Sequence, residues 1–176
     1  DYGPWPVSEG LCTLEEHRNL PIDVQAKHLF STNLIDDVII ANEFASEEEL
    51  KALSNIDPYM LSLKIELKDG IPDAQKDIVF KNIHFNRGDI SEYMIRSSKY
   101  RVSPDTPGFE PFNTTDIKRG DITIDNSLYQ NYTGELHIAL KDMDNDGKTN
   151  VVGKIAEDEV FLIDYIKPWQ KFRFNL

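Results

Sequence analysis

The chain has 176 residues, 28% of them charged, and a formal net charge of −12 at neutral pH. This length suits one domain with its own core, or a small domain joined to part of another. The acidic balance disfavours nucleic acid and anionic membranes as partners, because a negative surface is repelled by both. The single cysteine, Cys12, excludes an internal disulfide, and no apolar run is long enough to span a bilayer. Without a visible signal peptide, these features favour a cytoplasmic protein.

The first third of the chain predicts helices around one buried strand. Two capping-box patterns, at residues 13–16 and 46–49, each predict the start of a helix. Pro21 suits the first turn of a further helix that extends to about residue 31. The apolar run DDVIIA, residues 36–41, predicts a strand buried on both faces, as in a parallel sheet. Helix, buried strand and helix in this order are typical of α/β folds.

After residue 57 the pattern changes to short strands separated by turns. Residues 61–67, LSLKIEL, alternate apolar and polar side chains, as a half-buried strand does. Further strands are expected at 83–85, 92–102, 121–125, 135–141, 149–155 and 171–174, with helices at 73–80 and 157–166. Many short strands are typical of a barrel or sandwich. We therefore expect a β-rich domain over residues 58–176, preceded by an α/β segment, residues 1–57, that is too small to fold alone.

Three arginines gather in the β-rich part. Arg87, Arg96 and Arg101 lie within fifteen residues on strand-like sequence. A guanidinium binds phosphate or carboxylate through two parallel hydrogen bonds, so this cluster predicts a site for a small anionic ligand. The tetrapeptide RGDI that begins at Arg87 recurs at Arg119, and in each copy we expect the Arg and Asp to fix a turn.

No metal or cofactor is predicted. Residues 142–147, DMDNDG, match the first half of a calcium-binding EF-hand loop, but Gly153 stands where the loop needs a bidentate Glu. The flanking residues are strand-like, so we interpret this segment as a hairpin turn. The four histidines show no metal-ligand spacing.

Two polar residues are expected at the carboxyl ends of strands in the first part. Glu9 lies in the loop after an expected strand, and Asn42 follows the run at 36–41. In an α/β barrel such loops carry the active site. A carboxylate there can act as acid, base or nucleophile, and an amide can bind a substrate oxygen. Glu9 fits an ordinary solvated loop equally well.

Six segments of the chain, taken together, resemble the bacterial 6-phospho-N-acetylmuramidases. They are residues 3–18 (GPWPVSEGLCTLEEHR), 34–50, 86–98, 117–129, 134–143 and 164–174, and they occur in the family's order. Cys12 stands where the family pattern has a proline. Residues 114–116, TTD, replace a more basic approach to the second RGD turn, which weakens a phosphate role for Arg119.

The resemblance implies the C-terminal half of a longer protein. Residues 1–57 would be the last two βα units of a (β/α)8 barrel, and residues 58–176 a cyclophilin-like, closed β-barrel domain. The whole protein would be a cytoplasmic glycosidase of peptidoglycan recycling that cleaves the β-1,4 bond of 6-phospho-N-acetylmuramyl-N-acetylglucosamine. The fragment by itself would be inactive, since the catalytic carboxylate pair is expected mainly on earlier barrel strands.

The resemblance also gives the candidate residues a substrate, a phosphorylated amino-sugar disaccharide. Glu9 is the candidate catalytic carboxylate, and the substrate-binding candidates are Asn42, Arg87, Arg96, Arg101 and Arg119. One alternative is a phosphosugar-binding module without chemistry. Peptidyl-prolyl isomerase activity is a third reading, which rests only on the cyclophilin-like topology.

Overall fold

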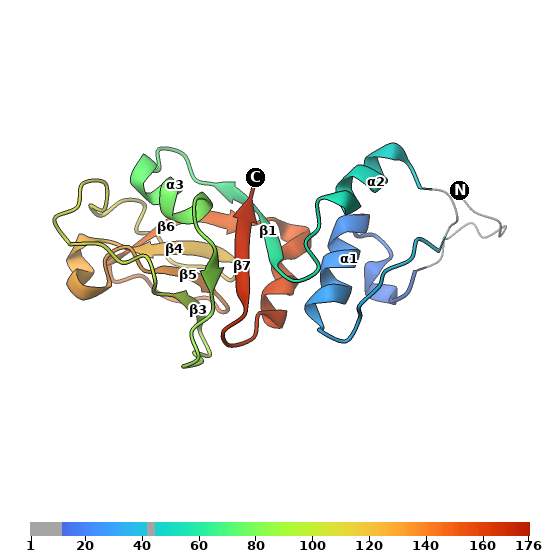
Figure 1. Ribbon diagram of the computed structural model, residues 1–176. Helices are drawn as coiled ribbons and strands as arrows, with labels where there is room; N and C mark the ends of the chain where they lie inside the picture. The colour runs from blue at the N-terminus through green and yellow to red at the C-terminus, as the bar shows by residue number, and fades with distance from the viewer. Residues whose placement is uncertain (1–11, 42–44) are drawn as a thin grey trace. The chain divides into compact units, whose positions relative to one another are not determined.

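The computed structural model of the chain describes residues 12–41 and 45–176. It forms two compact units, Asp1–Leu61 and Ser62–Leu176 (Figure 1). The candidate site residues Glu9 and Asn42 lie outside the described residues. Within the described ranges, no helix is both long and apolar enough to cross a bilayer.

The first unit contains a 3₁₀ turn, η1 (Glu15–His17), and two helices, α1 (Ile22–Ser31) and α2 (Glu47–Ser54). The capping box predicted at the start of α2 is confirmed. Glu49 N–H donates to Ser46 Oγ at 3.2 Å, and Ser46 N–H donates to Glu49 Oε2 at 2.8 Å. α1 begins directly after Pro21, as expected, and packs against α2.

Two predictions for this unit are wrong. The pattern at 13–16 starts only the single turn η1, whose N-terminal residue Leu14 has no capping side chain. The run at 36–41 forms no strand and is not buried, since Ile39 is 86% exposed. A strand buried on both faces needs neighbouring strands, and the described residues of this unit supply none. The α/β character expected for residues 1–57 is therefore not confirmed.

The second unit is a seven-stranded barrel. Its strands are β1 (Leu61–Leu67), β2 (His84–Phe85), β3 (Met94–Ser97), β4 (Asp121–Asp125), β5 (Leu136–Ala139), β6 (Thr149–Ile155) and β7 (Lys171–Asn175), in the spatial order β2-β7-β1-β6-β4-β5-β3. The connections include α3 (Asp73–Phe80) and two 3₁₀ segments, η2 (Ser127–Tyr132) and η3 (Glu157–Tyr165). The predicted bounds of β1, β4, β6 and α3 are confirmed.

The barrel is nearly closed, because its two edge strands approach each other. Arg87 N–H, just after β2, donates to the carbonyl oxygen of Arg96 in β3 at 3.0 Å. Beside this bond, the buried His84 ring lies 3.0 Å from Ser97 Oγ, measured from Nδ1. The expectation of a barrel rather than a sandwich is therefore confirmed.

Alternation along the strands divides β3, β4 and β5 into two faces. One register row joins Ile122, Ile138 and Ile95, all of which are buried in the core. The core also contains Leu63, Ile65, Ile124, Leu136, Val152, Ile155, Leu162, Ile163 and Phe172. The adjacent row joins Thr123, His137 and Arg96, which therefore lie on the opposite face of the sheet.

The segment at 142–147 is not a hairpin turn. It connects β5 to β6, but β4 lies between these two strands and pairs with both. The segment therefore passes over β4 from one neighbouring strand to the other, and its residues Asp144, Asn145 and Asp146 line a cavity on the polar face of the sheet. Its Asp146 forms an ion pair with Lys148 at 2.9 Å, and its Asn145 amide donates to the carbonyl oxygens of Thr115 and Thr149.

Candidate functional site

A cavity of about 660 Å³ lies on the polar face of β3, β4, β5 and β6. Its volume is within the roughly 300–1,000 Å³ typical of small-molecule sites. Three kinds of side chain line it: apolar groups from Met94, Ile117, Ala139 and Met143, the rings of Tyr129 and Tyr132, and polar groups from Ser91, Arg96, Thr123, Asp125, His137, Asp144, Asn145, Asp146 and Thr149. A lining that mixes polar, aromatic and apolar groups suits an amphipathic small molecule such as a sugar.

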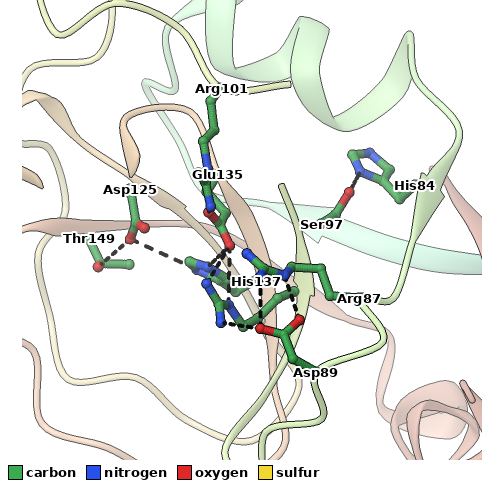
Figure 2. Close-up of polar contacts among 10 residues, drawn as sticks. His84, Arg87, Asp89, Ser97, Arg101, Asp125, Glu135, His137 and Thr149 are labelled. Carbon is green, nitrogen blue, oxygen red and sulfur yellow. Dashed lines mark hydrogen bonds and ion pairs between the residues drawn. The ribbon is translucent and has the colours of Figure 1, made fainter. Parts of the chain in front are cut away.

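Three of the predicted arginines meet beside this cavity (Figure 2). Arg87 binds Asp89 through two parallel hydrogen bonds of 2.6 and 2.7 Å. Arg96 lies 3.5 Å from the same carboxylate and donates to Glu135 Oε1 at 3.2 Å. Arg101 donates to Glu135 Oε2 at 2.6 Å. Three guanidinium groups thus share the two carboxylates Asp89 and Glu135, while the cavity lining adds the carboxyl groups of Asp125, Asp144 and Asp146.

Glu135 is the buried centre of this cluster, with a side chain that is fully inaccessible. Burial by itself raises the pKa of a carboxyl group. Here hydrogen bonding and charge from His137 and Arg101 outweigh burial and lower the pKa of Glu135 to about 2. Glu135 is therefore ionised at neutral pH and fixes the two arginines that it binds.

His137 lies between two carboxyl groups. Its Nε2 is 3.4 Å from Glu135 Oε1, and its Nδ1 is 3.8 Å from Asp125 Oδ1. Asp125 Oδ1 also accepts a hydrogen bond of 2.9 Å from the Thr149 hydroxyl. The other oxygen, Oδ2, is buried and has no hydrogen-bond partner among the described residues. Burial raises the pKa of Asp125 to about 6, against the opposing charge of His137.

Arg119 lies apart from the cluster. Its guanidinium donates to the Leu140 carbonyl oxygen at 2.9 Å and to Asp164 at 2.8 Å. The two RGD triplets therefore differ in structure: the first forms the expected Arg–Asp pair, whereas in the second Asp121 accepts from the Lys118 N–H. In the second copy Asp121 fixes the turn at residues 118–121, as expected, whereas the Arg119 side chain binds groups outside that turn.

The sequence interpretation missed Asp125, Glu135, His137 and Thr149. Asp125 and Thr149 are far apart in the chain and become neighbours only through the pairing of β4 with β6. A local signal did exist. In β4 the residues Asp121, Thr123 and Asp125 alternate with isoleucines, and Glu135 and His137 are likewise two residues apart. Polar residues with this spacing share one face of a strand.

The first unit holds a second group of titratable side chains, Glu16, His17 and His28. Both histidines are buried, and His17 Nε2 lies 2.7 Å from His28 Nδ1. Glu16 Oε1 is 3.7 Å from the same His28 nitrogen. Burial and the charge of His28 lower the pKa of His17. Residues 17 and 28 approach each other because α1 turns back toward η1, which no sequence spacing indicated.

Comparison with known proteins identifies the relatives of this chain. The family model described as 6-phospho-N-acetylmuramidase, C-terminal, matches residues 61–175, and the one described as 6-phospho-N-acetylmuramidase, N-terminal, matches residues 1–55. The chain belongs to the 6-phospho-N-acetylmuramidase family. It carries sequence of both family regions, as the resemblance of the separate segments indicated. No protein in a set of curated proteins matches it.

Two solved structures resemble this chain over all or nearly all of its length. An uncharacterized B. cereus protein shares 47% identity and superposes with a TM-score of 0.91, covering 100% of this chain and 51% of that one. A conserved Enterococcus faecalis protein of unknown function shares 25% identity with a TM-score of 0.69, covering 99% of this chain and 47% of that one. The chain therefore spans about half the length of these structures.

Proposed function

We propose that this chain is part of a cytoplasmic glycosidase that hydrolyses 6-phospho-N-acetylmuramyl-β-1,4-N-acetylglucosamine, and that the barrel cavity binds the phosphorylated muramyl sugar. Family membership supports the substrate and the reaction. The chain spans about half of its solved relatives, so hydrolysis is assigned to the longer protein and substrate binding to the barrel unit.

The observation that carries this proposal is the group of three arginines beside the cavity. Arg96 lines the cavity, and the adjacent Arg87 and Arg101 contribute to the local field. Each guanidinium has five N–H donors, so a group already bound to a carboxylate keeps donors for a second anion. An anionic group of a ligand is directed to these arginines, since Asp125, Asp144 and Asp146 in the cavity lining repel negative charge.

The candidate residues differ in the support they receive. Arg96 is the first candidate for the phosphate or the lactyl carboxylate, followed by Arg87 and Arg101. Arg119 is the weakest, because its donors bind Leu140 and Asp164 away from the cavity. Glu9 as a catalytic carboxylate and Asn42 as a sugar-binding amide remain part of the proposal on sequence grounds alone.

Calorimetric titration of 6-phospho-N-acetylmuramic acid into the chain tests this assignment, beside the unphosphorylated sugar. The phosphorylated ligand should bind more tightly, and Arg96→Ala should remove the difference. Arg119→Ala is the matched control, since it removes an arginine of similar exposure that does not line the cavity. Equal affinity for both sugars, or equal losses in the two variants, would contradict the proposal.

A hydrolysis assay separates the enzyme from the alternative, a phosphosugar-binding module without chemistry. The longer protein, with sequence corresponding to the rest of its solved relatives, should cleave the phosphorylated disaccharide. Arg96→Ala in that protein should raise KM for it. Binding by the longer protein without any cleavage would favour the binding module.

A further inference from the structure

We propose that Asp125 is the hydrogen-bond acceptor of a neutral sugar subsite in the barrel cavity, where its Oδ2 binds a hydroxyl or the acetamido N–H of the amino sugar. The identity of the sugar rests on the proposed function, whereas the subsite rests on the cavity itself. Asp125 would act in binding and specificity, with no part in bond cleavage.

The first argument is the unsatisfied oxygen. Asp125 is 2% exposed, and its Oδ2 has no partner among the described residues although Oδ1 is bound by Thr149. Buried polar atoms in folded proteins are almost always hydrogen-bonded, because an unmet acceptor forfeits its solvation. Asp125 lines the cavity, and its Oδ2 is closed to solvent, so a ligand supplies the missing donor once the carboxyl group or its neighbours shift slightly.

The second argument is the chemistry of the neighbouring groups. The carboxylate repels phosphate, so the anionic end of a ligand is directed to Arg96 and a donor group to Asp125. The contacts Asp125–His137, His137–Glu135 and Glu135–Arg96 follow one another at 3.8, 3.4 and 3.2 Å. The acceptor and the anion-binding groups thus belong to one continuous cluster, which a single ligand can contact.

The third argument is the shape of the lining. Tyr129 and Tyr132 form a tilted ring pair with centroids 5.0 Å apart on one wall. Ile117, Ala139 and Met143 form an apolar group in the lining. A sugar ring presents C–H groups to aromatic surface and hydroxyls to polar groups, and an N-acetyl methyl suits an apolar group. This combination favours an amino sugar over a small inorganic anion.

The substitution Asp125→Asn tests the inference, because asparagine keeps the shape while it removes the charge and one acceptor. Affinity for N-acetylmuramic acid and for its 6-phosphate should fall by the same factor, about tenfold or more, as for a lost hydrogen bond to a charged group. Affinity for inorganic phosphate should not fall.

Asp121→Asn is the matched control. Asp121 lies on the same strand, is also buried, and has a pKa raised by burial, but it accepts from the Lys118 N–H and does not line the cavity. Its substitution should leave sugar affinity unchanged. Unchanged sugar affinity in Asp125→Asn, or an equal loss in both variants, would overturn the inference.

A second measurement uses the unaltered chain. Carbon-13 NMR follows the carboxyl signal of Asp125 as the pH changes, with and without saturating N-acetylmuramic acid. A ligand donor stabilises the ionised form, so the pKa of Asp125 should fall from about 6 on binding. An unchanged or higher pKa in the complex would overturn the subsite.

The proposed function and the subsite fail separately. If Arg96→Ala leaves the preference for phosphate intact while Asp125→Asn still weakens the unphosphorylated sugar, the phosphate assignment is wrong and the subsite stands. If the phosphate preference depends on Arg96 but neither sugar responds to Asp125→Asn, the subsite is wrong.

Discussion

The buried carboxylate of Glu135 accepts a hydrogen bond of 2.6 Å from Arg101 Nε. Arg101 lies in the segment after β3, and its guanidinium also lies over the Tyr132 ring, 4.6 Å from the centroid. Glu135 therefore links the chain beyond β3 to a wall of the cavity. The position of that wall depends on a charge that the solvent does not reach.

The substitution Glu135→Gln should destabilise the barrel. It leaves Arg96, Arg101 and His137 without their buried negative partner, and breaking a buried pair from one side costs about 3 kcal/mol. Urea unfolding at pH 7 measures this loss. Glu157→Gln is the control, because Glu157 forms an exposed ion pair with Lys154. Equal stability of the two variants would contradict a structural role for Glu135.

The same substitution should change the response to acid. The pKa of Glu135 is about 2 in the folded protein and 4.5 as a free side chain. Its ionised form therefore stabilises the fold above about pH 4.5, and this contribution disappears as the pH falls toward 2. The Glu135→Gln variant should lack this part of the loss of stability in acid. Urea unfolding between pH 5 and pH 3 would measure the difference.

The substitution Asp125→Asn should have the opposite effect on stability from Glu135→Gln. It should raise the free energy of unfolding in alkaline solution. The pKa of Asp125 rises from 3.8 to about 6 on folding, so stability is favoured while the group is protonated and declines as the pH rises through 6. Removing the charge should raise the free energy of unfolding at pH 8 by up to about 3 kcal/mol.

Melting temperatures of the two proteins at pH 8 and pH 4 check this prediction. The gain from Asp125→Asn should disappear at pH 4, where both proteins are largely neutral at this position. A variant that is less stable than the unaltered protein at pH 8 would contradict it. A gain in stability together with a loss of sugar affinity would identify Asp125 as a residue kept for binding.

His84 should make the barrel sensitive to mild acid. Burial lowers the pKa of His84 to about 4, and the ring stacks on Phe172 at a centroid distance of 5.5 Å. The unfolded chain takes up this proton near pH 6.5, so stability falls as the pH drops from 6.5 to 4. In His84→Gln the free energy of unfolding should vary less over this range. If the stability of the variant depends on pH as steeply as that of the unaltered protein, the loss of stability does not come from His84.

Substitution of Gly88 by alanine should displace the Trp169 side chain. A Cβ added at Gly88 would lie 2.4 Å from Trp169 Cζ2, and the indole is stacked with Phe85 at 6.1 Å. Trp169 is largely exposed and can rotate away, so Gly88→Ala should cost only about 1 kcal/mol. Tryptophan fluorescence should report the lost stacking. Gly147→Ala, whose φ of +86° adds backbone strain but whose Cβ meets no atom within 4 Å, should leave the emission unchanged. An unchanged emission spectrum in Gly88→Ala would contradict the contact.

The sequence predicted correctly those strands whose limits are set by residues within the strand or directly beside it. β1, β4 and β6 alternate or are bounded by clear turns, and their limits are as expected. β3 was expected over 92–102 but ends at Ser97, which pairs with Leu136 at the first residue of β5. Beyond that pair β5 offers no further partner, so the length of β3 depends on a strand that lies elsewhere in the chain.

In the site, too, the sequence revealed groups that are close together in the chain and did not reveal partners that are far apart in it. The arginines were found because they lie close together in sequence, and the structure does gather three of them. Their carboxylate partner Glu135 is 39 residues from Arg96 and 34 from Arg101, so only the register of β3 with β5 unites them. Charge balance within the cluster, which decides whether it can bind an anion, was therefore not accessible from sequence.

The arginine cluster lies where the two edge strands of the barrel, β2 and β3, approach each other. One main-chain hydrogen bond joins Arg87 to Arg96 across the two edge strands, and both side chains contact Asp89. Any anion held by the two guanidinium groups spans the gap between these strands and adds its binding energy to the closed form. Opening of the barrel and release of the ligand are then one linked equilibrium, so the amide hydrogen of Arg87 should exchange more slowly in the complex.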